Sequence, residues 1–149
     1  MFKTIILALD GSEPSSGPAR YATKLAQDFD GRVVVVHVNQ LIAGRGAGPV
    51  HVDETDRQAH VRRQVAEMKA AGLEVEFVRA ATVRTPARSI AETAKVVGAD
   101  VIVTGATEHG PLIGALTGDT PQALLHMAPC PVLVASSLIR SDEREPIAA

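Results

Sequence analysis

The chain has 149 residues, which suits one domain better than two, and 46% of them are hydrophobic, enough for a buried core. Charged residues make up 21% and the formal net charge is -2, which excludes a disordered acidic protein and argues against nucleic-acid binding through bulk positive charge. Aromatic residues are only 3%, too few for recognition of single strands by base stacking.

Five short apolar runs predict β-strands, at 4–9, 32–38, 73–80, 101–104 and 132–135. The second run contains four successive valines, and such continuous apolar content indicates burial on both faces of a parallel sheet. The third run alternates enough to be a strand near the edge of that sheet.

Four segments with apolar residues at helical spacing predict helices between these strands. The first follows Ser12 as a cap, with Glu13 and Pro14 in its first turn, and ends at Gly31. The other three are expected at about 53–71, from the Thr85-Pro86 pair to Gly98, and at about 120–127.

Strands that alternate with helices of this length predict an α/β protein with an open five-stranded parallel sheet, in the order 3-2-1-4-5, and helices on both faces, as in Rossmann-like folds. Ligands of such sheets bind beyond the carboxyl ends of the strands at the switch point, here strands 1 and 4. The segments 10–12 and 105–107, which follow these two strands, are therefore the candidate ligand-binding segments.

A glycine-containing loop follows the fourth strand, with four glycines between 105 and 119. Backbone amides in such a loop can face an anion, although a long flexible connection would have the same composition. The loop is not a Walker A motif, because Pro111 and Leu112 follow Gly110 where Lys and Ser or Thr are needed.

Four stretches give a more specific signal: IILALDGS at 5–12, VVHV at 35–38, DVIVTG at 100–105 and HMAPCPVLV at 126–134. In this order they resemble the universal stress protein family, and the resemblance extends over 2–136. It implies a Rossmann-like fold of the adenine nucleotide alpha hydrolase-like group. We expect one domain over residues 1–136, followed by a charged tail over 137–149.

In nucleotide-binding members of that family, the loop after the fourth strand has the pattern Gly-x2-Gly-x9-Gly-Ser/Thr. Its first and third glycines fall on Gly105 and Gly118, but its second glycine falls on Glu108 and its hydroxyl residue on Asp119. Each carboxylate about 4 Å from a phosphate would cost about 1 to 4 kcal/mol, unless a bound metal reverses the effect. Asp119 can instead cap the last helix.

The part of the family site that binds adenosine is better preserved in this sequence than the part that binds the phosphates. The resemblance makes Asp10 the ribose contact and Val38 the adenine contact, although Asp10 also suits a helix-preparing turn and Val38 a core position. His109 can contact a phosphate when protonated. The predicted nucleotide-binding residues are Ala8, Asp10, Val38, Thr104, Gly105, Ala106, Glu108, His109, Gly118, Asp119 and Thr120.

Other reactive side chains give weaker signals. His51 and His60 with Asp53 and Asp56 match no strong metal-binding spacing, and no Ser/His/Asp set is identifiable, so we predict no metal and no catalytic residue. His37 lies on a buried strand and is expected to bond to backbone. Cys130, the single cysteine, cannot form an internal disulfide and is interpreted as a small buried apolar residue.

The sequence predicts a cytoplasmic protein without a membrane span or a nucleic-acid partner. Together with the family resemblance, it predicts a regulatory module that binds AMP or a nucleoside better than ATP and is not an enzyme. One alternative is a member that binds no nucleotide and acts through its dimer surface; another is a slow metal-dependent ATP hydrolase using Asp10 or Asp119. Family resemblance implies a homodimer and a regulatory protein partner, the dimer forming through the last strand at Val132, Leu133 and Val134.

Overall fold

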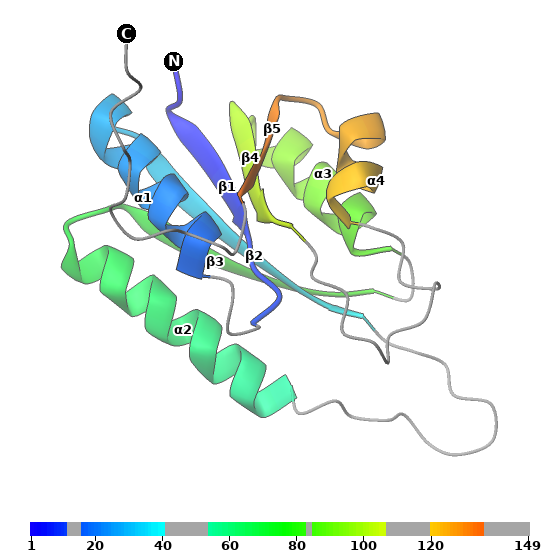
Figure 1. The fold of residues 1–149 in the computed structure, drawn as a ribbon, viewed down its shortest axis with the longest axis horizontal. Helices are drawn as coiled ribbons and strands as arrows, with labels where there is room; N and C mark the ends of the chain where they lie inside the picture. Colours follow the sequence, from blue (N-terminus) through cyan, green and yellow to red (C-terminus); the bar gives the residue numbers. More distant parts are fainter. Residues whose placement is uncertain (12–15, 41–53, 83–84, 107–119, 136–149) are drawn as a thin grey trace, which may run out of the picture.

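The computed structural model describes residues 1–11, 16–40, 54–82, 85–106 and 120–135. Strands and helices alternate along the chain (Figure 1). Their bounds are β1 Thr4–Ala8, α1 Ser16–Phe29, β2 Arg32–Gln40, α2 Glu54–Ala70, β3 Val75–Thr82, α3 Pro86–Val97, β4 Val101–Gly105, α4 Thr120–Met127 and β5 Val132–Ala135.

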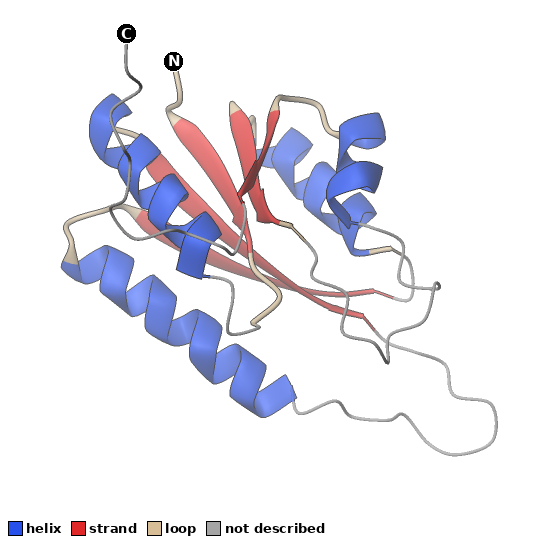
Figure 2. Ribbon diagram, in the orientation of Figure 1, coloured by secondary structure: helices blue, strands red, loops and turns tan. Residues whose placement is uncertain are grey.

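The five strands form one parallel sheet in the order β3-β2-β1-β4-β5, which confirms the predicted fold class and strand order. Figure 2 shows the sheet between two layers of helices. After each strand the chain must return to the starting end of the sheet before it can form the next parallel strand, and it does so through a helix that crosses one face of the sheet. This arrangement places the carboxyl ends of all strands at one edge.

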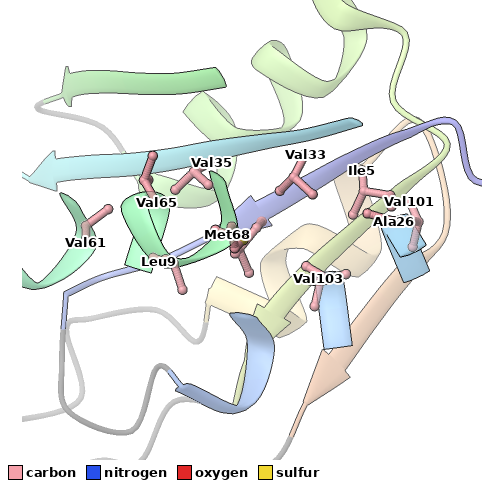
Figure 3. Packing of buried hydrophobic residues seen from close by; sticks show 12 residues of the cluster. Ile5, Leu9, Ala26, Val33, Val35, Val61, Val65, Met68, Val101 and Val103 are labelled. Atoms are coloured by element: carbon pink, nitrogen blue, oxygen red, sulfur yellow. The ribbon is translucent and has the colours of Figure 1, made fainter. Parts of the chain in front are cut away.

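Each face of the sheet carries its own hydrophobic core. On one face, Val61, Val65 and Met68 of α2 pack with Val33 and Val35 of β2 (Figure 3), together with residues of α1, β1 and β4. On the opposite face, α3 and α4 pack against the alternate residues of the same strands through Ala87, Ile90, Ala91, Ala94 and Leu124. Successive strand residues point to opposite faces, so the continuous apolar runs fill both cores.

Helix α1 is described from Ser16, and the predicted first turn at Glu13 and Pro14 lies in residues 12–15, outside the described part. The ends of two predicted strands are wrong. Strand β2 extends to Gln40, and β3 occupies Val75–Thr82 instead of 73–80. Leu73 lies just after α2, in the connection to β3, and its N–H donates to Met68 O at 3.2 Å.

Backbone pairing explains why β2 and β3 run past the apolar residues. Asn39 pairs with Ala81 and Gln40 with Thr82, beyond the apolar side chains that marked β2 in the sequence. Ladder hydrogen bonds need only the peptide groups, so polar side chains do not end the pairing. The alternating burial of β3 at the edge of the sheet confirms the prediction of an edge strand.

Helix α3 shows the expected flanking residues. Thr85 has an extended backbone and Pro86 follows at the first helical position, but the Thr85 side chain makes no capping hydrogen bond. Gly98 ends the helix in the left-handed conformation, with φ 65°, and its N–H donates to Ala94 O. A left-handed terminal residue explains the glycine, since any other residue would be strained there.

The start of β1 is fixed to the start of β4 by one carboxylate. Asp100 Oδ2 accepts hydrogen bonds from the backbone N–H groups of Lys3 and Thr4, each at 2.9 Å. The Asp100 N–H in turn donates to Thr4 O at 2.8 Å. These bonds set the register of the two strands whose far ends form the switch point.

None of the helices in the described segments is long and apolar enough to cross a membrane.

Candidate functional site

The carboxyl ends of β1 and β4 lie side by side, as the strand order predicts. Ala8, the last residue of β1, pairs with Thr104 of β4. Gly105 and Ala106 follow Thr104, and Asp10 follows β1 at the same edge. The fold therefore brings five of the predicted nucleotide-binding residues together at the switch point, where ligands of open parallel sheets bind.

A row of side chains crosses the sheet at this level and forms the floor of the candidate site. Val36 pairs with Ala8, Ala8 with Thr104, and Thr104 with Val134. Paired residues of parallel strands point to the same face, which here is the face covered by α3 and α4. Val134 was predicted only as a dimer-edge residue; its place beside Thr104 depends on the strand register.

Val38 lies on the same face, next along β2 from Val36. It is partly buried, pairs with Ala80 of β3 and packs against the α3 and α4 core. This packing places Val38 at the margin of the core. Its role as an adenine contact stays a prediction, although its place on the same face as Ala8 and Thr104 is compatible with that role.

The turn after β1 is held from the opposite face of the sheet. His37, only 2% exposed, places Nδ1 2.9 Å from the Leu9 carbonyl oxygen. A carbonyl oxygen only accepts hydrogen bonds, so Nδ1 is the donor in this contact. The Leu9 N–H donates to Val36 O at 3.0 Å. The prediction that His37 bonds to backbone in the core is confirmed.

Gly11 completes this turn with a backbone that only glycine adopts easily. Its φ is 78°, and a Cβ at this position would lie 2.6 Å from Arg57 Cβ and 2.7 Å from Arg57 O. Glycine therefore allows both the left-handed conformation and the close approach of the turn to α2. The preceding Asp10 is exposed and has an interaction partner of its own.

The beginning of the loop after β4 is partly committed to the protein itself. The Ala106 N–H donates to Ala135 O at 2.9 Å, so this amide is not available to a phosphate. Gly105 lies against Pro18, whose Cγ would be 3.2 Å from an added Cβ. The remaining predicted loop residues, Glu108, His109, Gly118 and Asp119, lie outside the described part of the chain. Thr120 begins α4, on the helix layer that covers the floor.

The other titratable candidates lie away from this edge or form no recognisable site. Within the described segments no group of three or more His, Cys, Asp or Glu residues is placed to hold a metal ion. Cys130 is half-buried and packs against the α3 and α4 core, as expected for a small apolar residue. Burial, and to a lesser degree the Asp100 carboxylate, raises the pKa of its thiol above the ordinary value.

The fold and the placement of these residues define a doubly wound parallel α/β protein with its candidate site at the switch point. Sequence comparison gives the family. A model of the universal stress protein family matches residues 1–136, and a universal stress protein of Thermus aquaticus is 33% identical over 136 residues, covering 90% of this chain and 98% of the relative. The chain belongs to the universal stress protein family.

Solved structures share the fold. A universal stress protein of Archaeoglobus fulgidus in complex with dAMP has a TM-score of 0.66 and 22% identity, with 90% of this chain and 98% of that chain covered. A universal stress protein in complex with cAMP has a TM-score of 0.68 and 20% identity, with 91% and 98% covered. At such identities the likeness concerns the fold alone.

Proposed function

We propose that this universal stress protein is a regulatory adenine-nucleotide-binding module that accepts adenosine or AMP more readily than ATP. One observation carries the proposal: Ala8 and Thr104 pair at the switch point, with Asp10 and Val38 beside them. The two relatives of the same fold that were solved with dAMP and cAMP support an adenine nucleotide as the class of ligand.

The weaker binding of ATP follows from charge. Glu108 and Asp119 occupy the positions where the family pattern has a neutral glycine and a hydroxyl residue. A triphosphate brings more negative charge to these carboxylates than a monophosphate does, and each contact at about 4 Å would cost about 1 to 4 kcal/mol. The Ala106 amide, which donates to Ala135 O, offers no compensating hydrogen bond.

Titration calorimetry with adenosine, AMP, ADP and ATP tests the proposal. We expect adenosine and AMP to bind, and affinity to fall from AMP to ADP to ATP when no divalent metal is present, because every added phosphate increases the repulsion. Tight ATP binding without metal would contradict the charge argument. No binding of any of the four ligands would favour the alternative that the protein acts without a nucleotide.

The variant Glu108→Gly with Asp119→Ser restores the family pattern. We expect its affinity for ATP to rise at least about tenfold, since two repulsive contacts are removed. The matched control is Glu67→Gly with Asp28→Ser, which removes the same charge from exposed positions on α2 and α1. Equal gains in both variants would assign the effect to net charge, and no gain in either would overturn the role given to the two carboxylates.

We also propose that the module does not turn ATP over. A hydrolase would need a metal and an activated water, and Asp10 or Asp119 would be the residues expected to help to hold that metal. Phosphate release from ATP with magnesium should therefore stay at the level of a buffer blank. Magnesium-dependent release that is lost in Asp119→Asn would overturn this statement.

A second candidate function, action through a homodimer surface, is supported by the edge strand β5. Val134 is 44% exposed, and β5 is the terminal strand of the sheet order. An apolar edge strand offers unpaired backbone groups to a second copy of the chain. The two functions are compatible, because a ligand at the switch point would lie close to β5.

A further inference from the structure

Thr104 differs from the other buried polar side chains in its hydrogen bonding. Among the described residues these are His37, Gln64 and Thr104, and Thr104 is only 5% exposed. His37 bonds to Leu9 O, and Gln64 also has a partner. No hydrogen bond joins the Thr104 hydroxyl to any described residue. Buried hydroxyls in folded proteins are nearly always hydrogen-bonded, so this one calls for a partner outside the described residues.

The hydroxyl is accessible to such a partner. Within the described segments, His60 Nε2 is the only fully enclosed side-chain nitrogen or oxygen without a hydrogen bond. The Thr104 oxygen, which also lacks one, is therefore not fully enclosed. Of its neighbours in the row, Ala8 is small and Val134 is 44% exposed.

The surroundings of Thr104 indicate what kind of group it can receive. Ala8 and Val134 flank it in the row, and Val36 lies beyond Ala8, so the floor has no charged side chain at this level. A phosphate placed there would be desolvated without a compensating cation. A hydroxyl donates and accepts, and therefore matches the uncharged polar edges of a nucleoside.

We infer that the Thr104 hydroxyl hydrogen-bonds the nucleoside part of the ligand and so helps to select it. The inference rests on the proposed function and adds a chemical role to one residue of the proposed site. In the ligand-free protein this hydroxyl is largely removed from bulk water and has no hydrogen-bond partner among the described residues, which lowers the stability of the fold. A bound nucleoside supplies the partner, so the hydroxyl adds to the affinity of the complex.

The test is the variant Thr104→Val, which replaces the hydroxyl by a methyl group of similar size. We expect the affinity for adenosine to fall about five- to tenfold, which corresponds to one lost hydrogen bond. AMP should lose affinity by the same factor, since the phosphate is not involved. The melting temperature of the ligand-free protein should stay the same or rise, because the variant removes a buried hydroxyl that has no partner among the described residues.

Two further variants make the result specific. Thr104→Ser keeps the hydroxyl and should retain most of the adenosine affinity. Thr93→Val removes a partly buried hydroxyl that already donates to Ser89 O at 2.9 Å on α3, and it should leave adenosine affinity unchanged. A lower melting temperature is expected only for this control, which loses a bond present in the free protein.

Each other outcome counts against the inference in a recognisable way. Wild-type affinity for adenosine in Thr104→Val overturns the inference and leaves the proposed function standing. Equal losses in Thr104→Ser and Thr104→Val assign the effect to shape and also overturn it. A selective loss for AMP would move the contact to the phosphate. If the wild-type protein binds neither adenosine nor AMP, the proposed function fails and the inference fails with it.

Discussion

Gly11 connects the candidate site to the helix layer on the other face of the sheet. Its left-handed backbone carries the chain from β1 past Asp10, and its missing side chain lets the turn lie directly on Arg57 of α2. The exposed Asp10 is thus fixed by a contact made one residue later. The orientation of the proposed ribose contact depends on how closely the turn approaches α2.

Replacing this residue by Gly11→Ala should destabilise the protein more than Gly98→Ala does. Both glycines have positive φ, but nothing lies within 4 Å of an added Cβ at Gly98, whereas Arg57 backbone atoms lie within 2.8 Å of one at Gly11. Strain alone costs about 1 to 2 kcal/mol, and the steric conflict adds about 1 to 3 kcal/mol. Urea unfolding measures both; equal losses would show that the turn moves away from α2 without cost.

Cys130 should react slowly with iodoacetamide near neutral pH. Burial and the Asp100 carboxylate raise its pKa, so the folded protein holds less of the reactive thiolate than the unfolded chain does. The alkylation rate of the native protein should therefore reach half its maximum at a higher pH than the rate in urea. Equal midpoints would contradict the effect of the surroundings. The same sign makes the fold less stable as pH rises above the pKa of the unfolded thiol.

At the scale of elements, the register of β1 and β4 is set far from the site. Asp100 receives two backbone hydrogen bonds at the amino ends of these strands, and the pairing of Ala8 with Thr104 follows at the carboxyl ends. A strand that slips by one residue turns all its side chains to the other face. The Asp100 carboxylate therefore helps to keep the floor of the site in place.

The variant Asp100→Ala should lower the free energy of unfolding by about 1 to 3 kcal/mol, because two backbone N–H groups lose a charged acceptor. Asp28→Ala is the matched control. It removes an exposed carboxylate that pairs with Lys24 on α1 at 2.7 Å, an interaction worth about 0.3 to 0.5 kcal/mol. Chemical denaturation compares the two. A loss for Asp100→Ala as small as that of the control would show that the strand ends are held by the ladder alone.

The sequence allowed the elements to be predicted wherever a physical rule acts locally. Continuous apolar runs identified the strands, and Thr85-Pro86 with Gly98 identified α3 almost to the residue. The ends of β2 and β3 were missed because their pairing rests on peptide groups, and these are the same in every residue.

The candidate site could likewise be predicted in part, where it follows from the strand order. The predicted strand order places Ala8, Asp10, Gly105 and Ala106 together at the carboxyl ends of the strands, because a switch point follows from topology. The place of Val134 beside Thr104 depends on the register between β4 and β5. That the Thr104 hydroxyl has no hydrogen-bond partner among the described residues depends on the positions of its neighbours. Residue type and spacing determine neither property.

At the scale of the whole molecule, the edge strand β5 is where we expect a second copy of the chain to pair. Pro131 O accepts from Ile102 N at 3.0 Å and Ala135 O accepts from Ala106 N at 2.9 Å. Backbone groups of a strand alternate in direction, so those of Val132 and Val134 turn away from β4. An edge with outward backbone groups and apolar side chains is the surface on which a second copy can pair.

Sedimentation at micromolar concentration should therefore show a dimer, and Val134→Lys should shift it toward the monomer, because lysine on an edge strand discourages pairing. The control Leu125→Lys places the same charge at a residue of α4 that is 64% exposed, and it should leave the dimer intact. A wild-type monomer would contradict the proposed surface. Equal dissociation in the two variants would assign assembly to a wider surface that includes α4.

The pairing of Ala8 with Thr104 also has a consequence for folding during synthesis. These two residues come from opposite ends of the domain in sequence, so the floor of the site exists only after β4 has been made and has docked beside β1. Contacts between distant parts of a chain form slowly, because the intervening loop must close first. A nascent chain that ends after β3 should therefore have no nucleotide-binding site, and the ability to bind a ligand would report that synthesis has passed β4.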